Sequence, residues 1–397
     1  MIPAAGAPLF DWDDAAKATA CSSRCPALHQ GWVNDGSVQV ALTAALANRF
    51  HSALSTVLGL HGRSLAVTTL ADPRAFNISE NSPMQSSAIV VVTGGLGFIG
   101  KHFVRRALAA GCFVKNIDKV SYAADRVAKV EFEQQKNYRF YQADICTLDF
   151  LPECDVFVNF AAESHVDNAI TNARRFCETN FLGVQNCLEL VRAKHDRERP
   201  LFIQVSTDEV YGDIREGAHA ESDQLVPSNP YSATKAAADM LVKSWGRTYG
   251  FDWNIVRPTN NYGVHQYPEK LIPKSAWRMK RGLPAVMHGD GSYVRSWLHV
   301  EDTVEAVLAV LDRGARSEIY NIGSGEERTN ITVLRNIAKL VGVPEDKAFT
   351  AATDRSGQDV RYSLDDSKLK ALGWAPKKHF DDELKTIIEQ LDHSRFV

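Results

Sequence analysis

A glycine-rich turn constrains the fold of this chain more than any other feature of the sequence. The run 88–93 is short, β-branched and apolar on both faces, which is typical of a central strand in a parallel sheet. It leads directly into GGLGFIG at 94–100, and residues 101–110 then place apolar side chains on one helical face. Strand, glycine turn and helix in this order predict an α/β fold, a Rossmann-type doubly wound parallel sheet that binds dinucleotide phosphates at the helix N-terminus.

The glycines and the following strand predict NAD as the cofactor. Gly94 permits a tight turn, Gly97 lets the backbone approach a pyrophosphate, and Gly100 lets helix and strand pack closely. A second strand, expected over 112–117, ends at Asp118, an acid that can accept both hydroxyls of an adenosine ribose and would repel the 2′-phosphate of NADP. The other predicted cofactor-binding residues in these loops are Phe98, Ile99, Asp144, Ile145, Ala161 and Ala162.

Two adjacent carboxyl groups follow another buried strand, expected over 201–205. Thr207, Asp208 and Glu209 come at its C-terminal end, where ligands gather in open α/β sheets. Oxidation of an alcohol needs no carboxyl pair, so the pair suggests a further proton abstraction and the protonation of a leaving group. The alternative is that one carboxyl group caps a turn or binds a surface cation.

A tyrosine and a lysine open the next helix, expected over 232–249. Tyr231 and Lys235 are four residues apart and therefore share one helical face. A nearby ammonium lowers the pKa of a phenol, so Tyr231 can act as a base toward an alcohol. We predict that both side chains are catalytic and also contact the cofactor.

These segments closely resemble the nucleotide-diphosphate-glucose 4,6-dehydratases, of which dTDP-glucose 4,6-dehydratase is the leading type, within the extended short-chain dehydrogenase/reductase superfamily. The matching motifs are STDEVYG at 206–212, SNPYSATK at 228–235, AAESHVD at 161–167, RPTNNYG at 257–263, YPEKLIP at 267–273, HGDGS at 288–292 and DRSGQD at 354–359. The resemblance covers residues 84 to about 390. It implies an NAD-binding core over about 84–255 and a smaller C-terminal lobe, mainly 256–397, that binds the sugar nucleotide.

The resemblance also implies a reaction and a role for each residue. The C4 hydroxyl of the sugar is oxidised by bound NAD, water is lost across C5 and C6, and hydride returns to C6, giving a 4-keto-6-deoxy sugar. Tyr231 takes the C4 hydroxyl proton, with Thr207 orienting the substrate and Lys235 tuning the tyrosine. Glu209 removes the C5 proton and Asp208 protonates the departing C6 oxygen.

Several other functions remain open at this point. We expect dTDP-glucose as the substrate, with UDP-glucose as the alternative because 267–270 and 294–296 also resemble the eukaryotic UDP-rhamnose-forming relatives. A 4-epimerase or decarboxylase of the same fold would share the tyrosine and lysine but would not need the carboxyl pair. An NAD-sensing module without activity would have little reason to keep the complete set. Val264 and Gln358 depart from the family pattern and leave base selectivity open.

The sugar nucleotide needs cations and hydrogen-bond partners. The predicted substrate-binding residues are Ser164, Asn260, Asn261, Glu269, Lys270, Leu271, Arg295 and Asp354. The resemblance makes Arg295 the best diphosphate ligand, whereas Arg361 ranks no higher than a surface ion pair. We expect His165 and His299 to be structural.

A homodimer is also implied by the family, which pairs the helix after Ala169 with the helix carrying Tyr231 across a two-fold axis. The side chains that these helices offer are Phe176, Leu182, Leu188, Ala236, Met240 and Leu241.

Composition excludes other partners. A formal net charge of -3 gives no general attraction to nucleic acid, and without an 18-residue apolar run we expect no membrane span. Seven irregularly spaced cysteines do not form a disulfide framework, which favours the cytoplasm. We expect residues 1–83 to be a poorly ordered extension, although an accessory element or a targeting peptide are alternatives. Within it, Cys21, Cys25 and His29 resemble half a metal site, but without a second ligand pair we predict no metal.

Overall fold

The computed structural model describes residues 33–34, 37–38, 88–354 and 357–396. The predictions for Cys21, Cys25 and His29, and for the order of most of the 1–83 segment, lie outside this part of the chain. Within that segment the structure describes strands β1 (Val33–Asn34) and β2 (Ser37–Val38), which pair in an antiparallel manner. None of the described helices is both long and apolar enough to cross a membrane.

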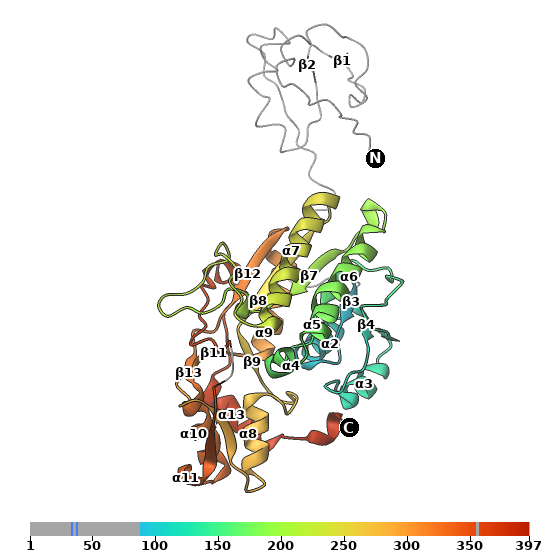
Figure 1. Ribbon diagram of the computed structural model, residues 1–397. Coiled ribbons are helices and arrows are strands. Elements are labelled where there is room, and N and C mark those ends of the chain that lie inside the picture. The colour runs from blue at the N-terminus through green and yellow to red at the C-terminus, as the bar shows by residue number, and fades with distance from the viewer. Residues whose placement is uncertain (1–32, 35–36, 39–87, 355–356, 397) are drawn as a thin grey trace, which may run out of the picture. The chain divides into compact units, whose positions relative to one another are not determined.

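A seven-stranded sheet organises the rest of the molecule (Figure 1). Its order is β12-β8-β7-β6-β3-β4-β5, and all neighbouring strands are parallel. The strands are β3 (Ile89–Thr93), β4 (Phe113–Asp118), β5 (Tyr138–Gln142), β6 (Val156–Asn159), β7 (Leu201–Val205), β8 (Trp253–Pro258) and β12 (Glu318–Ile322). The direction of strand order reverses between β3 and β6, which is where dinucleotides bind in such sheets. The predicted doubly wound sheet is confirmed.

Helices cover both faces of this sheet because its strands are apolar on both sides. One buried cluster packs α2 (Phe98–Ala109), α3 (Arg126–Glu133) and α9 (Val300–Arg313) on one face. A second cluster packs α6 (Gly183–Arg192) and α7 (Pro230–Tyr249) on the other. Helices α4 (Val166–Thr171) and α5 (Ala173–Phe176) and the π-helical turn Cys177–Leu182 lead into α6.

A smaller lobe has its own apolar core. Its sheet has the order β13-β11-β9, and β10 pairs with β14 beside it. The lobe contains β9 (Asn260–Tyr262), α8 (Leu271–Met279), β10 (Ala285–His288), β11 (Val294–His299), β13 (Glu327–Thr329), α10 (Asn330–Val341), α11 (Glu345–Ala348), β14 (Phe349–Ala352) and α13 (Phe380–Glu389).

The lobe expected mainly over 256–397 is interrupted by parts of the core. Helix α9 and strand β12 return to the large sheet, because β12 pairs in parallel with β8 and needs a crossover helix to reach it. Helix α12 (Ser367–Lys370) packs beside β12 as well. The lobe is therefore drawn from two stretches of chain on either side of this crossover.

The last described turn, His393–Phe396, runs back from the lobe to the core, where the red end of the chain lies near α3 (Figure 1). Arg395 donates from Nε to Asp125 Oδ2 at 3.0 Å. The same oxygen accepts a hydrogen bond from Lys101 Nζ at 2.8 Å, and both Lys101 and Asp125 are buried. This turn ties the lobe to the core through a buried carboxylate.

Candidate active site

A cavity of about 300 Å³ lies at the C-terminal ends of the central strands, between the large sheet and the loops of the lobe. It is lined by most of the residues predicted from the sequence. These are Gly94, Gly97, Phe98, Ile99, Gly100, Asp118, Asp144, Ile145, Ala161, Ala162, Ser164, Thr207, Asp208, Glu209, Tyr231, Lys235, Asn260, Asn261, Glu269 and Lys270.

The glycine turn forms a cradle that side chains would fill. A Cβ on Gly100 would lie 2.2 Å from the carbonyl oxygen of Gly94, and one on Gly94, whose φ is +70°, would lie 2.7 Å from the amide nitrogen of Ala161. Helix α2 begins at Phe98, and its N-cap, Gly97, offers no side chain to the first amide groups. These uncapped amides lie at the cavity, so the turn fits a dinucleotide pyrophosphate.

Asp118, predicted to bind the adenosine ribose, lies beside this cradle. Its Oδ2 accepts a hydrogen bond from the Leu96 amide at 3.0 Å, and its Oδ1 accepts one from the Val120 amide at 2.8 Å. Burial raises the pKa of Asp118, while the two amide bonds lower it. The residue is thus held by the glycine turn itself, at the position where a ribose-binding acid is expected.

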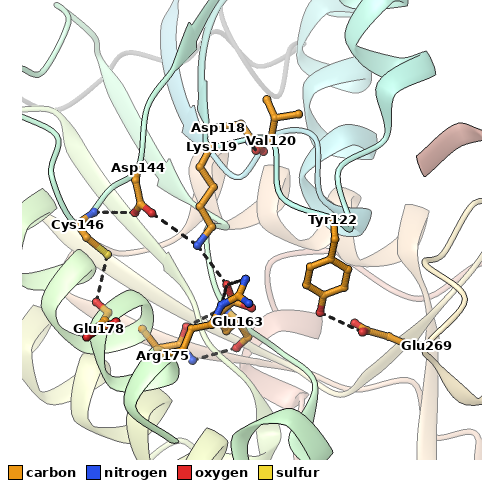
Figure 2. Close-up of polar contacts among 11 residues, drawn as sticks. Asp118, Lys119, Val120, Tyr122, Asp144, Cys146, Glu163, Arg175, Glu178 and Glu269 are labelled. Atoms are coloured by element: carbon orange, nitrogen blue, oxygen red, sulfur yellow. Dashed lines mark hydrogen bonds and ion pairs between the residues drawn. The ribbon is translucent and has the colours of Figure 1, made fainter. Parts of the chain in front are cut away.

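A network of charged side chains beside Asp118 was not predicted from the sequence (Figure 2). Lys119 Nζ lies 3.1 Å from Glu163 Oε1 and 3.7 Å from Asp144 Oδ2. Arg175 Nη2 lies 2.9 Å from the same oxygen of Glu163. The charges come from loops after three different strands and from α5, so no local sequence pattern could bring them together.

Figure 2 also shows a contact between the cofactor half and the lobe. The Tyr122 hydroxyl donates to Glu269 Oε2 at 3.0 Å, and both residues line the cavity. Glu269 therefore contacts the cofactor half of the cavity, and its assignment to substrate binding stays a prediction.

Asp208 is buried in a short 3₁₀ turn, Asp208–Val210, directly after β7. Its Oδ2 accepts a hydrogen bond from Thr259 Oγ1 at 2.7 Å, and its Oδ1 accepts one from Thr207 Oγ1 at 3.1 Å. Burial, and then the charge of Glu209, raise the pKa of Asp208 to about 7. The carboxyl group is therefore able to carry a proton at neutral pH.

Glu209 has a different environment from its neighbour. Asn229 Nδ2 donates to Glu209 Oε2 at 3.4 Å. Burial raises the pKa of Glu209, but the positive charges of Arg295 and Lys270 oppose this shift. Burial therefore raises the pKa of both carboxyl groups, but their partners differ: threonine hydroxyls hold Asp208, whereas Asn229 and the charge of Lys270 act on Glu209.

Tyr231 and Lys235 share one face at the start of α7, whose N-terminus is capped by Asn229. One expectation about them is wrong. Lys235 Nζ donates to the carbonyl oxygen of Val205 at 2.7 Å, and burial lowers the lysine pKa to about 8. The pKa of Tyr231 is raised, by burial and then by Glu209, instead of being lowered by the lysine. Helical spacing predicts a shared face but not which atom a flexible ammonium contacts.

Three predicted substrate-binding residues do not line the cavity. Leu271 packs against the core of the lobe, and Asp354 is an exposed residue. Arg295 is buried and donates to the carbonyl oxygens of Val294 at 2.7 Å and Asp359 at 3.0 Å. Its guanidinium therefore contacts backbone within the lobe, although its charge still acts on both carboxyl groups of the cavity.

His165, His299 and Arg361, which were not assigned to the chemistry, make contacts within the protein. His165 Nε2 lies 3.4 Å from the carbonyl oxygen of Glu269. His299 is buried, and its Nδ1 accepts a hydrogen bond from the Glu301 amide at the start of α9. Arg361 makes an ion pair with Glu327 at 2.6 Å.

Thr259 is a site residue that sequence reasoning missed. It lies within the motif at 257–263, but its contact with Asp208 spans 51 residues of chain. Only the pairing of β7 with β8 brings the two ends together, so no spacing rule could have indicated it.

Comparisons with known proteins agree with this architecture. Residues 91–387 match the family model of GDP-mannose 4,6 dehydratase. The low-salt glycan biosynthesis protein Agl12 of Haloferax volcanii is 44% identical over 305 residues, which cover 76% of this chain and 97% of that protein. The dTDP-glucose 4,6-dehydratase of Streptomyces niveus is 41% identical over 311 residues, which cover 76% of this chain and 91% of that enzyme.

A solved structure shares the fold at similar coverage. DesIV, a dTDP-glucose 4,6-dehydratase of Streptomyces venezuelae solved with NAD and dTDP, is 38% identical with a TM-score of 0.73, covering 76% of this chain and 96% of that one. The family predicted from the motifs is thereby confirmed: the chain belongs to the nucleotide-sugar 4,6-dehydratases, the family of GDP-mannose 4,6 dehydratase and dTDP-glucose 4,6-dehydratase.

Proposed function

We propose that this protein is an NAD-dependent hydro-lyase that converts dTDP-glucose to dTDP-4-keto-6-deoxyglucose. The observation that carries the proposal is the carboxyl pair Asp208 and Glu209 beside Tyr231, in one cavity with the glycine cradle. A 4-epimerase or decarboxylase would need the tyrosine but not two carboxyl groups of different character. Relatives acting on dTDP-glucose support this choice of nucleotide.

The glycine turn with Gly94, Gly97 and Gly100 would hold NAD, which would supply a hydride acceptor for C4 and a hydride donor for C6. Tyr231 is the base for the C4 hydroxyl proton, and Thr207, which lines the same cavity, orients that hydroxyl. Because burial raises the tyrosine pKa, the phenol stays protonated until the site supplies positive charge near it. Lys235, whose pKa is lowered to about 8, lies on the same helical face, where its charge would tune the tyrosine.

The elimination uses the difference between the two carboxyl groups. Glu209, whose pKa is raised by burial against the opposing charges of Arg295 and Lys270, removes the C5 proton in its ionised form, after the C4 ketone has made that proton acidic. Asp208, with a pKa of about 7, donates its proton to the C6 oxygen as water leaves. Both carboxyl groups line the same cavity as Tyr231, so the intermediate need not move between these two steps.

The test uses purified protein with dTDP-glucose and UDP-glucose in separate reactions. Loss of water to a 4-keto-6-deoxy product supports the proposal, and the faster substrate identifies the nucleotide. Inversion at C4 or release of carbon dioxide would contradict it. In deuterated water, Glu209→Gln should block exchange at C5 while NAD stays bound. Glu216→Gln, at an exposed loop position, is the matched control and should exchange like the parent.

We also propose that the protein is a homodimer. Of the side chains expected at the interface, Phe176, Leu188 and Ala236 are buried inside the protomer. Three apolar side chains on neighbouring elements remain exposed: Ile170 on α4 at 41%, Leu182 at the end of the π-helical turn at 50%, and Met240 on α7 at 43%. Light scattering should give twice the chain mass, and Met240→Asp should reduce it to one chain. The control Val130→Asp, on the exposed side of α3, should leave the mass unchanged.

A cytoplasmic location is proposed as well. The irregular spacing of the seven cysteines, which does not suggest a disulfide framework, supports this proposal. Cell fractionation of a tagged full-length chain tests this, and recovery with a membrane or secreted fraction would contradict it.

A further inference from the structure

The sequence contains conflicting signals for the choice between NAD and NADP. Asp118 ends β4 and favours the free ribose hydroxyls of NAD. The next residue is Lys119, which lines the same cavity. A cation near the ribose acid is the kind of side chain that accommodates the 2′-phosphate of NADP. An acid alone therefore does not explain how the site would reject NADP.

The structure shows that this lysine is held elsewhere. Its ammonium lies 3.1 Å from Glu163 Oε1 and 3.7 Å from Asp144 Oδ2. In Figure 2 the Lys119 side chain extends away from Asp118 and Val120 toward Glu163. The contact spans the end of β3, because Lys119 follows β4 and Glu163 follows β6, which lie on either side of it.

Glu163 is built as a fixed anchor for this contact. Its side chain is only 9% exposed, and its carboxylate is also held by Arg175 Nη2 at 2.9 Å. Its backbone is held at both ends by the fully buried side chain of Asn180 in the π-helical turn. The Glu163 amide donates to Asn180 Oδ1 at 2.9 Å, and Asn180 Nδ2 donates to the Glu163 carbonyl at 3.0 Å. Glu163 is thus held through its carboxylate and its backbone, whereas the Lys119 side chain is 31% exposed.

The charges around Lys119 also disfavour binding of the 2′-phosphate of NADP. Lys119 and Arg175 are neutralised by Asp144 and Glu163, and Asp118 adds a further carboxyl group. Of the described side chains, Lys119 and Arg175 are therefore already paired with carboxylates at this end of the cavity. A partly buried group is screened less by salt than an exposed one, so this balance is felt by a bound ligand.

We propose that Glu163 is a positioning residue for cofactor selectivity: by holding Lys119 away from Asp118, it excludes NADP. The inference rests on the proposed use of NAD and identifies a second determinant beside Asp118. If this is so, Lys119 could bind the 2′-phosphate of NADP but is kept from doing so by its contact with Glu163.

The experiment is a competition at equilibrium on the full-length protein. Labelled NAD is displaced by unlabelled NADP or NAD, which gives the ratio of the two affinities without any turnover. Glu163→Gln should shift this ratio toward NADP by about fivefold or more, while the NAD affinity changes by less than about twofold. The shift should shrink as ionic strength rises.

Two further variants identify the cause. Lys119→Met should leave the ratio unchanged in the parent but abolish the shift in Glu163→Gln, a coupling that a double-mutant cycle measures. Glu178→Gln is the matched control, because Glu178 pairs with the exposed Arg174 and does not touch Lys119. An unchanged ratio in Glu163→Gln, or a shift that survives Lys119→Met, would overturn the inference.

The remaining outcomes are also decisive. If Glu163→Gln does not fold by circular dichroism, Glu163→Asp keeps the charge but shortens the reach, and should give a smaller shift in the same direction. A parent protein that binds NAD but dehydrates no sugar would refute the proposed function and leave this inference standing.

Discussion

The hydrogen bond from Thr259 to Asp208 sets the pH range in which the proposed acid can work. Thr259 Oγ1 lies 2.7 Å from Asp208 Oδ2, and this bond lowers the pKa of the buried carboxyl group, which is about 7 in its presence. Thr259→Val removes the hydroxyl with little change of shape. The ionised form of Asp208 then loses more than the neutral form, so its pKa must rise.

The size of the rise in the Asp208 pKa follows from the difference between a hydrogen bond to a charged carboxylate and one to a neutral carboxyl group. A hydrogen bond to a charged group contributes about 1.5–3 kcal/mol and a neutral one about 0.5–1.5 kcal/mol, and a difference of about 1.4 kcal/mol is one pKa unit. The pKa of Asp208 should therefore move from about 7 to about 8. The acid works only in its protonated form, so at pH 8 the variant should keep about half of its maximal rate where the parent keeps about a tenth.

The assay is the rate of 4-keto-6-deoxy product formation between pH 5.5 and about 9.5 at saturating substrate, a range chosen to bracket both limbs. Thr332→Val is the matched control, because its hydroxyl pairs with Thr329 in the lobe and does not reach either carboxyl group. In the pH–rate profile of Thr259→Val, the fall in rate at alkaline pH should lie at higher pH than in the parent. A fall at the same pH as in the parent, or at lower pH, would refute the assignment of Asp208 as the acid.

Three further predictions follow from buried groups. Gly100→Ala adds a Cβ 2.2 Å from the Gly94 carbonyl oxygen, so NAD affinity measured by calorimetry should fall by about tenfold or more, and unchanged affinity would contradict the cradle. Asp239→Asn leaves the buried Arg257 without its carboxylate partner at 2.9 Å, and the free energy of unfolding in urea should drop by about 3–5 kcal/mol. The pKa of Asp208 is about 7 in the folded protein and lower in the unfolded chain, so the stability of the parent falls as pH rises toward 7. The free energy of unfolding of Asp208→Asn, measured relative to the parent, should therefore increase between pH 5 and 8 by on the order of 2–4 kcal/mol. An equal difference between variant and parent at the two pH values would contradict the raised pKa.

The large sheet could be predicted from the sequence because its signals are local. Each central strand is a short apolar run ended by a functional residue, and the glycine turn marks the first strand. The extent of the lobe could not be predicted in the same way. Strand β12 belongs to the large sheet only because it pairs with β8, and that pairing joins residues 60 or more positions apart.

In the site, residue identity was predictable but orientation was not. Motifs place Arg295 and Lys235 near the chemistry, yet Arg295 turns into the lobe and Lys235 binds a backbone carbonyl. Both side chains are long, so sequence position determines where the chain passes and not where the charge lies. The Lys119 network depends on three loops and a π-helical turn, and it emerges only when the sheet is assembled.

The turn His393–Phe396 has a mechanical consequence for how ligands reach the cavity. A lobe that opened on a hinge would separate Arg395 from Asp125 and would expose the Lys101 ammonium, which binds the same carboxylate. It would also strain the chain at β8, α9 and β12, where it passes between lobe and core. Breaking a buried ion pair is costly, so such a motion is disfavoured. Access must come from local movement at the rim, such as release of Tyr122 from Glu269. The lobe and the core should thus keep nearly the same separation with and without the sugar nucleotide, so that the radius of gyration barely changes. Only side chains at the cavity entrance should move.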